Sequence, residues 1–509
     1  MSEPTDHSAV VAPQSTPEVI SASTRDALAE MMRQAAPAVV AMVSYTAMQF
    51  LDGLMVSRIG PDPGYVGAQG NGGAAAFIPM SVMLGLLSMV NTYVAQNLGA
   101  GTPRQAPAYA WTGLWLVLAA WILVLVPYGI FLPDVFHLVA PDHEPHVHAM
   151  EVSYGRVLIF AGGFTMASRC LAQFFYGLHR PSVVLASALA ANLFNLVGNT
   201  VLIFGPTPPA ETGISLIDGW LRFWAHIAAQ LHIPALGVTG AAVSTALGTI
   251  LELSIPLAVF LGPKLNAALG TRQAWRFSLA HARRLIRFGW PGAVMFGNEM
   301  ICWAYLMAVL IGHFGPVHNS AGWIALRYMH LAFMPAIGVS FAVTAQVGKC
   351  MGAGRPDLAQ HRAYLGLAIN MGYMGLCALF FVAFRREAIA LFAEPDMPAD
   401  RRAELLSVGA GVMIAASIFQ LFDALGITIS SALRGAGDTV WPGAITVGLA
   451  WSCLVAGGTY LAFQQPQLGS LGPWGAASAY IILLGISLYV RFVRGKWKLR
   501  RLVEPTILH

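Results

Sequence analysis

Four polar residues that fall inside apolar segments have the chemistry to bind a cation together. Asp52 supplies a carboxylate, Asn195 and Asn199 supply amide oxygens, and Thr245 supplies a hydroxyl. At a helical rise of about 1.5 Å per residue, Asp52 and Asn199 lie ~9 Å from the outer ends of their segments, and Thr245 lies ~13 Å from the outer end of its segment. Asn195 follows Asn199 one turn deeper on the same helix face. Such hard oxygen ligands predict a cation or proton site at one depth.

A second acidic pair lies in the other half of the chain. Glu299 and Asp423 each fall near the middle of an apolar segment. Two carboxylates in a medium of low dielectric repel each other and lose solvation, so we expect at least one to hold a proton or a cation. An acid at membrane depth seldom persists without a role.

The remaining ionisable residues leave alternatives open. Glu252 lies nearer the end of its segment, where its carboxylate can reach water. Arg169 and Arg327 either pair with acids or extend to the interface, and the sequence does not choose between these. Four histidines fall in one predicted loop: His137, His143, His146 and His148. Their spacing fixes no coordination geometry, so we expect no metal site there.

The elements that position these residues are apolar segments long enough to cross a membrane, which takes roughly 20 residues each. We predict twelve: 34–57, 74–98, 109–132, 154–177, 183–205, 236–261, 286–314, 320–350, 361–384, 405–432, 440–463 and 471–494. Hydrophobic residues make up 56% of the 509 and charged residues 10%. A soluble chain would carry about a quarter charged residues, so the sequence predicts an all-α integral membrane protein.

The chain also repeats itself. Pro37 and Pro291 open equivalent apolar stretches, which end in the motifs Leu98-Gly99-Ala100-Gly101 and Met351-Gly352-Ala353-Gly354. A doubled apolar sequence is typical of membrane transporters built from two related bundles, so we predict two pseudo-symmetric six-helix bundles. The predicted divisions are a disordered tail at 1–28, bundles at 29–262 and 285–495, a linker at 263–284 and a basic tail at 496–509.

Positive charge gathers at two places and predicts the topology. Lysines and arginines cluster in the central linker and at the C-terminal end, and such regions face the cytoplasm. An even number of spans puts both termini on that side. The connector 206–234 falls outside, and its stretch 216–232 has the helical spacing of a segment that lies on the membrane surface.

Several sequence motifs resemble the multidrug and toxic compound extrusion (MATE) family over about residues 28–495. In the first half these are the segment around Asp52, the motif 94–101, Asn195-Leu196-Val197-Gly198-Asn199, and Leu236-Gly237-Val238-Thr239-Gly240 ahead of Thr245. In the second half, Gly289-Trp290-Pro291 ahead of Glu299, and Asp423 ahead of Leu433-Arg434-Gly435-Ala436-Gly437, resemble the bacterial, NorM-like branch. Phe419 departs from that branch, which commonly has a tyrosine one turn before the acid.

The resemblance implies an antiporter in the bacterial inner membrane that expels small organic cations or other amphipathic compounds in exchange for Na⁺ or H⁺. It implies a MATE-type fold, a monomer surrounded by lipid, and no cofactor besides the coupling ion. Residues able to line an adaptable cavity are Met48, Phe50, Met295, Phe296 and Trp303.

Other functional classes fit less well. A flippase for lipid-linked oligosaccharides shares the bundle plan, but it would favour basic residues at depth for a pyrophosphate head, and this sequence offers mainly acids. We find no metal-ligand spacing, nucleophile elbow or phosphate loop of an enzyme. The net charge of +5 is too small to suggest a nucleic-acid partner.

Overall fold

The computed structural model describes residues 23–60, 64–139, 144–209, 213–392, 397–500 and 502–503. Its regular structure within these ranges is helical, and twelve helical spans are long and apolar enough to cross a membrane. The predicted all-α chain with twelve spans is therefore confirmed. Most of the predicted tail at 1–28, half of the tail at 496–509, and His143 lie outside the described residues.

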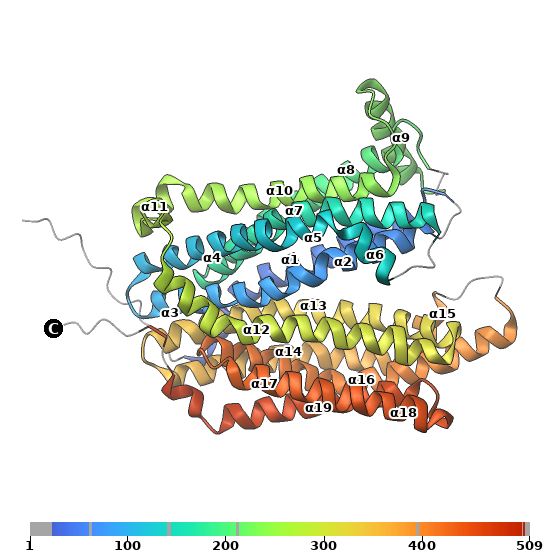
Figure 1. The fold of residues 1–509 in the computed structure, drawn as a ribbon. Helices are drawn as coiled ribbons and strands as arrows, with labels where there is room; N and C mark the ends of the chain where they lie inside the picture. Colours follow the sequence, from blue (N-terminus) through green and yellow to red (C-terminus); the bar gives the residue numbers. More distant parts are fainter. Residues whose placement is uncertain are drawn as a thin grey trace, which may run out of the picture.

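The first six spans form one bundle (Figure 1). They are α1 (Thr24–Val56), α2 with α3 (Gly64–Leu87, Met89–Gly99), α4 with η2 and α5 (Ala106–Ala120, Trp121–Leu125, Val126–Ile130), α7 (Pro145–Gly177), α8 (Pro181–Phe204) and α10 (Gly237–Leu261). Three short helices connect them or follow them: α6 (Leu132–Val139), α9 (Ser215–Gln230) and α11 (Pro263–Leu269). The helix predicted in the connector 206–234 corresponds to α9.

The last six spans form the second bundle, drawn below the first in Figure 1. They are α12 with η4 (Leu279–Tyr305, Leu306–Ile311), α13 (Pro316–Gly352), α14 (Pro356–Ala383), α16 (Ala399–Gly435), α17 with η6 and α18 (Val440–Leu449, Ala450–Gly457, Gly458–Gln464) and α19 (Leu471–Val493). The short helix α15 (Arg385–Ala390) follows α14. We call the end where α1 begins and α19 ends the terminal end, and the opposite end, where α9 projects, the α9 end (Figure 1).

The repeated Gly-Ala-Gly motifs end equivalent helices in the two bundles. Gly101 and Gly354 follow α3 and α13 with φ of +74° and +72°, a left-handed conformation that glycine adopts without strain. In each half a proline comes two residues later, and Pro356 opens α14. The two copies of the motif therefore end a helix and turn the chain in the same way.

The same motifs bring the bundles together at the terminal end. A Cβ on Gly99 would lie 1.9 Å from the Lys349 carbonyl oxygen, and a Cβ on Gly352 would lie 2.0 Å from that of Gln96. Each equivalent glycine thus contacts the backbone of the other bundle. Small residues permit such close helix approach in lipid, where no hydrophobic effect drives association. The pseudo-symmetry of the sequence is expressed as a reciprocal contact between α3 and α13.

Candidate functional site

The four polar residues predicted to form one site lie together in the first bundle. Asp52 is near the end of α1, Asn195 and Asn199 share one face of α8, and Thr245 comes from α10. Asn199 is fully buried, and its Nδ2 donates to Asp52 Oδ1. The Asn195 amide reaches Asp52 on one side and Thr245 Oγ1, at 3.1 Å, on the other. One hydrogen-bonded cluster therefore links three helices.

The Asn195 amide can satisfy this cluster in two orientations. With its nitrogen toward the carboxylate, it donates to Asp52 Oδ1 across 2.9 Å and its oxygen accepts from Thr245 Oγ1. With its oxygen toward the carboxylate, its nitrogen donates to Thr245 and Asn199 Nδ2 donates to its oxygen at 2.9 Å. The second orientation places two acceptors face to face, so it needs a proton on Asp52 or a cation between the oxygens.

Tyr154 on α7 lies near this cluster, although the sequence did not single it out. Its side chain is 6% exposed, it makes a hydrogen bond with Gln69 of α2, and it lies within electrostatic reach of Asp52. A tyrosine near the end of a predicted span is usually an interfacial anchor, so position alone gave no signal. Tyr154 brings α7 and α2 into contact with the ion-binding candidate.

The acids of the second bundle are neighbours but share no hydrogen bond with each other among the described residues. Glu299 comes from α12 and Asp423 from α16, and the two carboxylates interact electrostatically. The hydroxyl of Tyr480, on α19, donates to Glu299 Oε1 across 3.1 Å and is 2% exposed. Phe419 lies buried in the core of this bundle. Tyr480 thus supplies a polar group to Glu299, and Phe419 supplies none to Asp423.

Glu252 does not reach water, as its position near a helix end had suggested. It is 6% exposed, the Tyr45 hydroxyl donates to its Oε1, and Arg169 Nη1 lies 3.6 Å from the same oxygen. The Arg169 guanidinium also stacks over the Tyr45 ring at 4.2 Å. The open question of Arg169 is therefore resolved in favour of pairing. Tyr45 lies two helical turns before Asp52 on α1, so the two clusters share one helix.

Comparison with known proteins identifies the family of the chain. The MatE family model matches residues 37–201 and 295–455, one segment in each bundle and more than half of the chain. The chain belongs to the MATE family.

This MATE-family chain is 29% identical over 470 residues to the multidrug resistance protein NorM of Burkholderia vietnamiensis, covering 90% of this chain and 92% of that one. The probable NorM of Pseudomonas syringae pv. tomato is 26% identical over 478 residues, covering 93% and 95%. These relatives place the chain in the NorM-like branch, as the sequence motifs had predicted. It is a multi-pass membrane transporter.

Solved structures confirm the fold of this MATE-family chain. A MATE protein in the straight conformation superposes with a TM-score of 0.77 at 18% identity, covering 93% of this chain and 97% of that one. A MOP superfamily transporter from Pyrococcus furiosus superposes equally well, with a TM-score of 0.77 at 17% identity and coverage of 94% and 98%. The predicted MATE-type fold is therefore confirmed.

The five residues predicted to line a substrate cavity differ in position and exposure in this MATE-family chain. Met295 lines a crevice between the bundles, beside Gly85 and Gly292. Met48 is buried and Phe50 is exposed. Phe296 is half-buried, and Trp303 packs against the core of the second bundle.

Arg327, whose partner was left open, stacks over the Phe392 ring at 5.8 Å. A cation–π contact of this kind holds a guanidinium near an interface without an acid. Arg327 therefore differs from Arg169, which pairs with a carboxylate.

Proposed function

We propose that this transporter exports organic, often cationic, compounds in exchange for an inward flow of Na⁺ or H⁺ by alternating access of its two bundles. The observation that carries the proposal is the Asp52 cluster, a carboxylate held by polar groups of α8 and α10 inside an apolar bundle. Its NorM relatives are named as multidrug resistance proteins. The flippase alternative is not favoured by these relatives.

Proton binding at Asp52 would reverse the hydrogen bonds of this cluster. A protonated Asp52 donates to the Asn195 oxygen, and the Asn195 nitrogen then donates to Thr245. An ionised Asp52 instead accepts from the Asn195 nitrogen, and Thr245 donates to the Asn195 oxygen. One proton thereby changes how α1 is held to α8 and α10. Only such a difference between states allows an ion to shift a conformational equilibrium.

A separate observation favours Na⁺ binding at the Asp52 cluster. Asn199 Oδ1 is buried and has no hydrogen-bond partner among the described residues. A buried acceptor left unpaired destabilises the fold. The Asn199 nitrogen faces Asp52 in this structure, so Na⁺ binding would require the Asn199 amide to rotate. Na⁺ would then be held by the Asp52 carboxylate with the Asn199 and Asn195 oxygens. Binding of a proton and binding of Na⁺ would thus require different hydrogen bonding by the same amides.

The contacts between the bundles at the terminal end are those expected in one closed state of an alternating-access cycle. Besides the glycine contacts, Glu30 of α1 reaches across to the second bundle, where Arg362 Nη2 and Lys349 Nζ lie 3.0 and 3.7 Å from its carboxylate oxygens. His179 of the first bundle lies 3.8 Å from Glu30. If the termini are cytoplasmic, as the charge rule predicts, this closure shuts the cytoplasmic side.

The acids of the second bundle would either bind the coupling ion or attract the substrate. Glu299 and Asp423 place two carboxyl groups near each other in the second bundle, where an ionised carboxylate would attract a cation of either kind. We expect the double variant Glu299→Gln with Asp423→Asn to weaken binding of organic cations more than binding of neutral compounds. Equal loss for both classes would assign the pair to coupling or folding instead.

The test is efflux of a fluorescent organic cation from proteoliposomes, driven by a Na⁺ gradient alone and then by a pH gradient alone. We expect one gradient to drive efflux by the unaltered protein and by Asp400→Asn, an exposed acid on α16. Asp52→Asn should remain folded and lose the driven efflux. No efflux under either gradient, or full efflux by Asp52→Asn, would overturn the proposal.

A further inference from the structure

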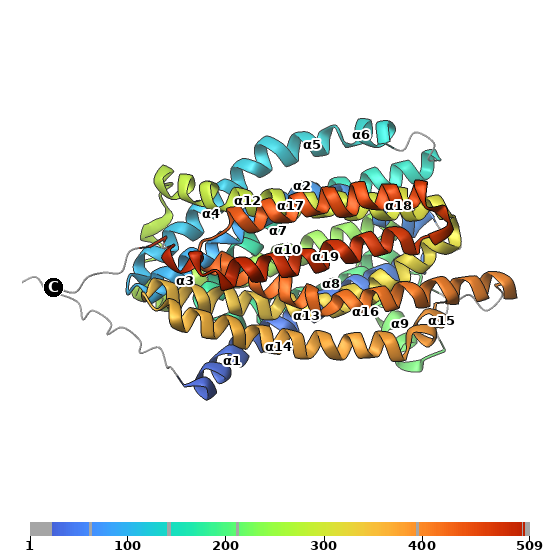
Figure 2. The ribbon, with the colours of Figure 1, turned by 90° about the horizontal axis from the view of Figure 1, so that it is seen from below.

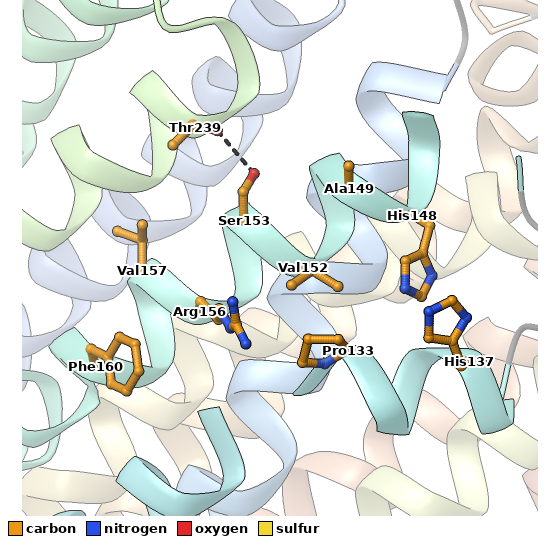
Figure 3. A pocket seen from close by; sticks show the side chains of 10 residues that line it. All are labelled: Pro133, His137, His148, Ala149, Val152, Ser153, Arg156, Val157, Phe160 and Thr239. Atoms are coloured by element: carbon orange, nitrogen blue, oxygen red, sulfur yellow. Dashed lines mark hydrogen bonds between the residues drawn. The ribbon is translucent and has the colours of Figure 1, made fainter. Parts of the chain in front are cut away.

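A cavity of about 560 Å³ lies at the α9 end of the first bundle, apart from the sites described above. It is bounded by α6, α7 and α10, and Figure 3 shows the side chains that line it. Arg156 of α7 and the imidazoles of His137 and His148 face it, and Val152, Val157 and Phe160 form apolar walls. The cavity therefore combines basic groups with a hydrophobic lining.

This cavity is separate from the Asp52 cluster because it lies on the other face of α7. Tyr154 lies within electrostatic reach of Asp52, and Arg156 follows two residues later, which turns it to nearly the opposite side of the helix. The helix α6, which lines the cavity, and α5, which precedes it, both pack against α7. Figure 2 shows them along one edge of the molecule.

Arg156 is held in place by backbone carbonyl groups and not by an acid of the described residues. Arg156 Nε and Nη2 donate to the carbonyl oxygens of Gly129 and Ile130 at 3.0 and 2.9 Å. No carboxylate in the described part of the chain forms an ion pair with Arg156. Two of the five guanidinium N–H groups are thus used to fix its position, and the others remain for a ligand.

The two histidines add ring nitrogens that can donate hydrogen bonds. Their rings stack with centroids 4.1 Å apart and planes at 29°. His148 Nε2 is buried and has no hydrogen-bond partner among the described residues. A guanidinium with free N–H groups and two imidazoles around one cavity favour an anionic ligand with several acceptor oxygens.

The surroundings of the cavity indicate where such an anion comes from. Ile130 and Phe131, at the end of α5, are 55% and 61% exposed, and Phe160 of the cavity wall is 39% exposed. In a membrane protein these surfaces face acyl chains. A free phosphate ion would gain nothing from apolar walls, whereas a lipid would bury its glycerol and upper acyl carbons against them.

We propose that this cavity binds an anionic phospholipid of the leaflet at the α9 end. Its phosphate contacts Arg156, its headgroup extends toward the imidazoles of His137 and His148, and its chains follow Val157 and Phe160. The bound lipid bridges α6 to α7 and braces the α5–α6 segment against the first bundle. A guanidinium recognises the phosphate, and because no acid in the described ranges pairs with Arg156, a headgroup with net negative charge is favoured.

The experiment compares lipids bound to the purified full-length protein by native mass spectrometry during titration with dioleoylphosphatidylglycerol or dioleoylphosphatidylcholine. We expect the unaltered protein to bind the glycerol lipid more tightly, and Arg156→Gln to weaken that binding about tenfold. Arg58→Gln, an exposed arginine at the same end, is the matched control and should bind as the unaltered protein does.

Arg156 also holds α5, so a second variant separates binding from folding. Val157→Trp keeps every basic group but fills the cavity, and it should lose the preference for the anionic lipid while its melting temperature without lipid stays unchanged. Equal binding of both lipids by the unaltered protein would overturn the proposal. Full competition by millimolar inorganic phosphate would do so too, because it would assign the cavity to free anions.

Discussion

The reciprocal glycine contact makes a quantitative prediction for Gly99→Ala. The new Cβ would meet the Lys349 carbonyl oxygen at 1.9 Å, where contacts under 3.0 Å are essentially never seen. Both partners are helix backbone, so no side chain can rotate away and α3 and α13 must separate by about 1 Å. Overpacking of this kind costs about 1–3 kcal/mol. That cost falls only on the arrangement closed at the terminal end.

The closed arrangement should therefore lose population by a factor of about 5 to 150. The assay is double electron–electron resonance between spin labels at Arg104 and Asp357, two exposed positions at the terminal end, one in each bundle. The five native cysteines are first replaced. We expect Gly99→Ala to shift the distribution toward longer distances, and Gly352→Ala to do the same.

The matched control is Gly372→Ala in α14, where a Cβ would meet nothing within 4 Å. It should reproduce the unaltered distribution, since it adds the same methyl group without a contact. If Gly99→Ala and the control give the same distances, then the α3–α13 contact does not hold the terminal end closed and the reasoning fails.

Three further variants test the charged and polar clusters. Glu30→Gln removes the carboxylate that joins the bundles, so the same spin-label pair should shift toward longer distances, and an unchanged distribution would contradict a latch. Glu252→Gln leaves Arg169 without its acid and should lower stability in detergent by about 1–3 kcal/mol, measured as a lower melting temperature that Arg169→Gln partly restores in the double variant. Tyr480→Phe removes about 1 kcal/mol of hydrogen bonding to Glu299 and should alter the Kd of a fluorescent cation severalfold in an anisotropy titration; an identical Kd would separate Glu299 from substrate binding.

The Asp52 cluster could be predicted because the evidence for it lies within single helices. Depth along a span follows from residue count, and Asn195 and Asn199 share a face by helical periodicity. Which helices are neighbours had to be assumed, and the structure brings α1, α8 and α10 together. Composition and the repeat likewise sufficed for twelve spans in two bundles.

The contacts of three tyrosines with the acidic clusters could not be predicted from the sequence, for a physical reason. Tyr45, Tyr154 and Tyr480 act through single hydroxyls, and a tyrosine in a span is usually read as packing or an interfacial anchor. Their roles depend on which helix faces which, as when α19 carries Tyr480 to Glu299. The repeat also predicted equivalent Gly-Ala-Gly motifs without indicating that they contact each other. Long-range pairing of this kind is not encoded in any local pattern.

The most direct test of ion coupling reverses the usual experiment and lets the substrate drive the ion. Proteoliposomes are loaded with an organic cation and placed in substrate-free buffer with equal Na⁺ and pH on both sides, and internal pH and Na⁺ are recorded as the substrate leaves. The account predicts that one of these ions enters as the substrate leaves through the unaltered protein, and that it does not enter with Asp52→Asn. Substrate efflux through the unaltered protein without movement of either ion, or the same ion entry with Asp52→Asn, would contradict it.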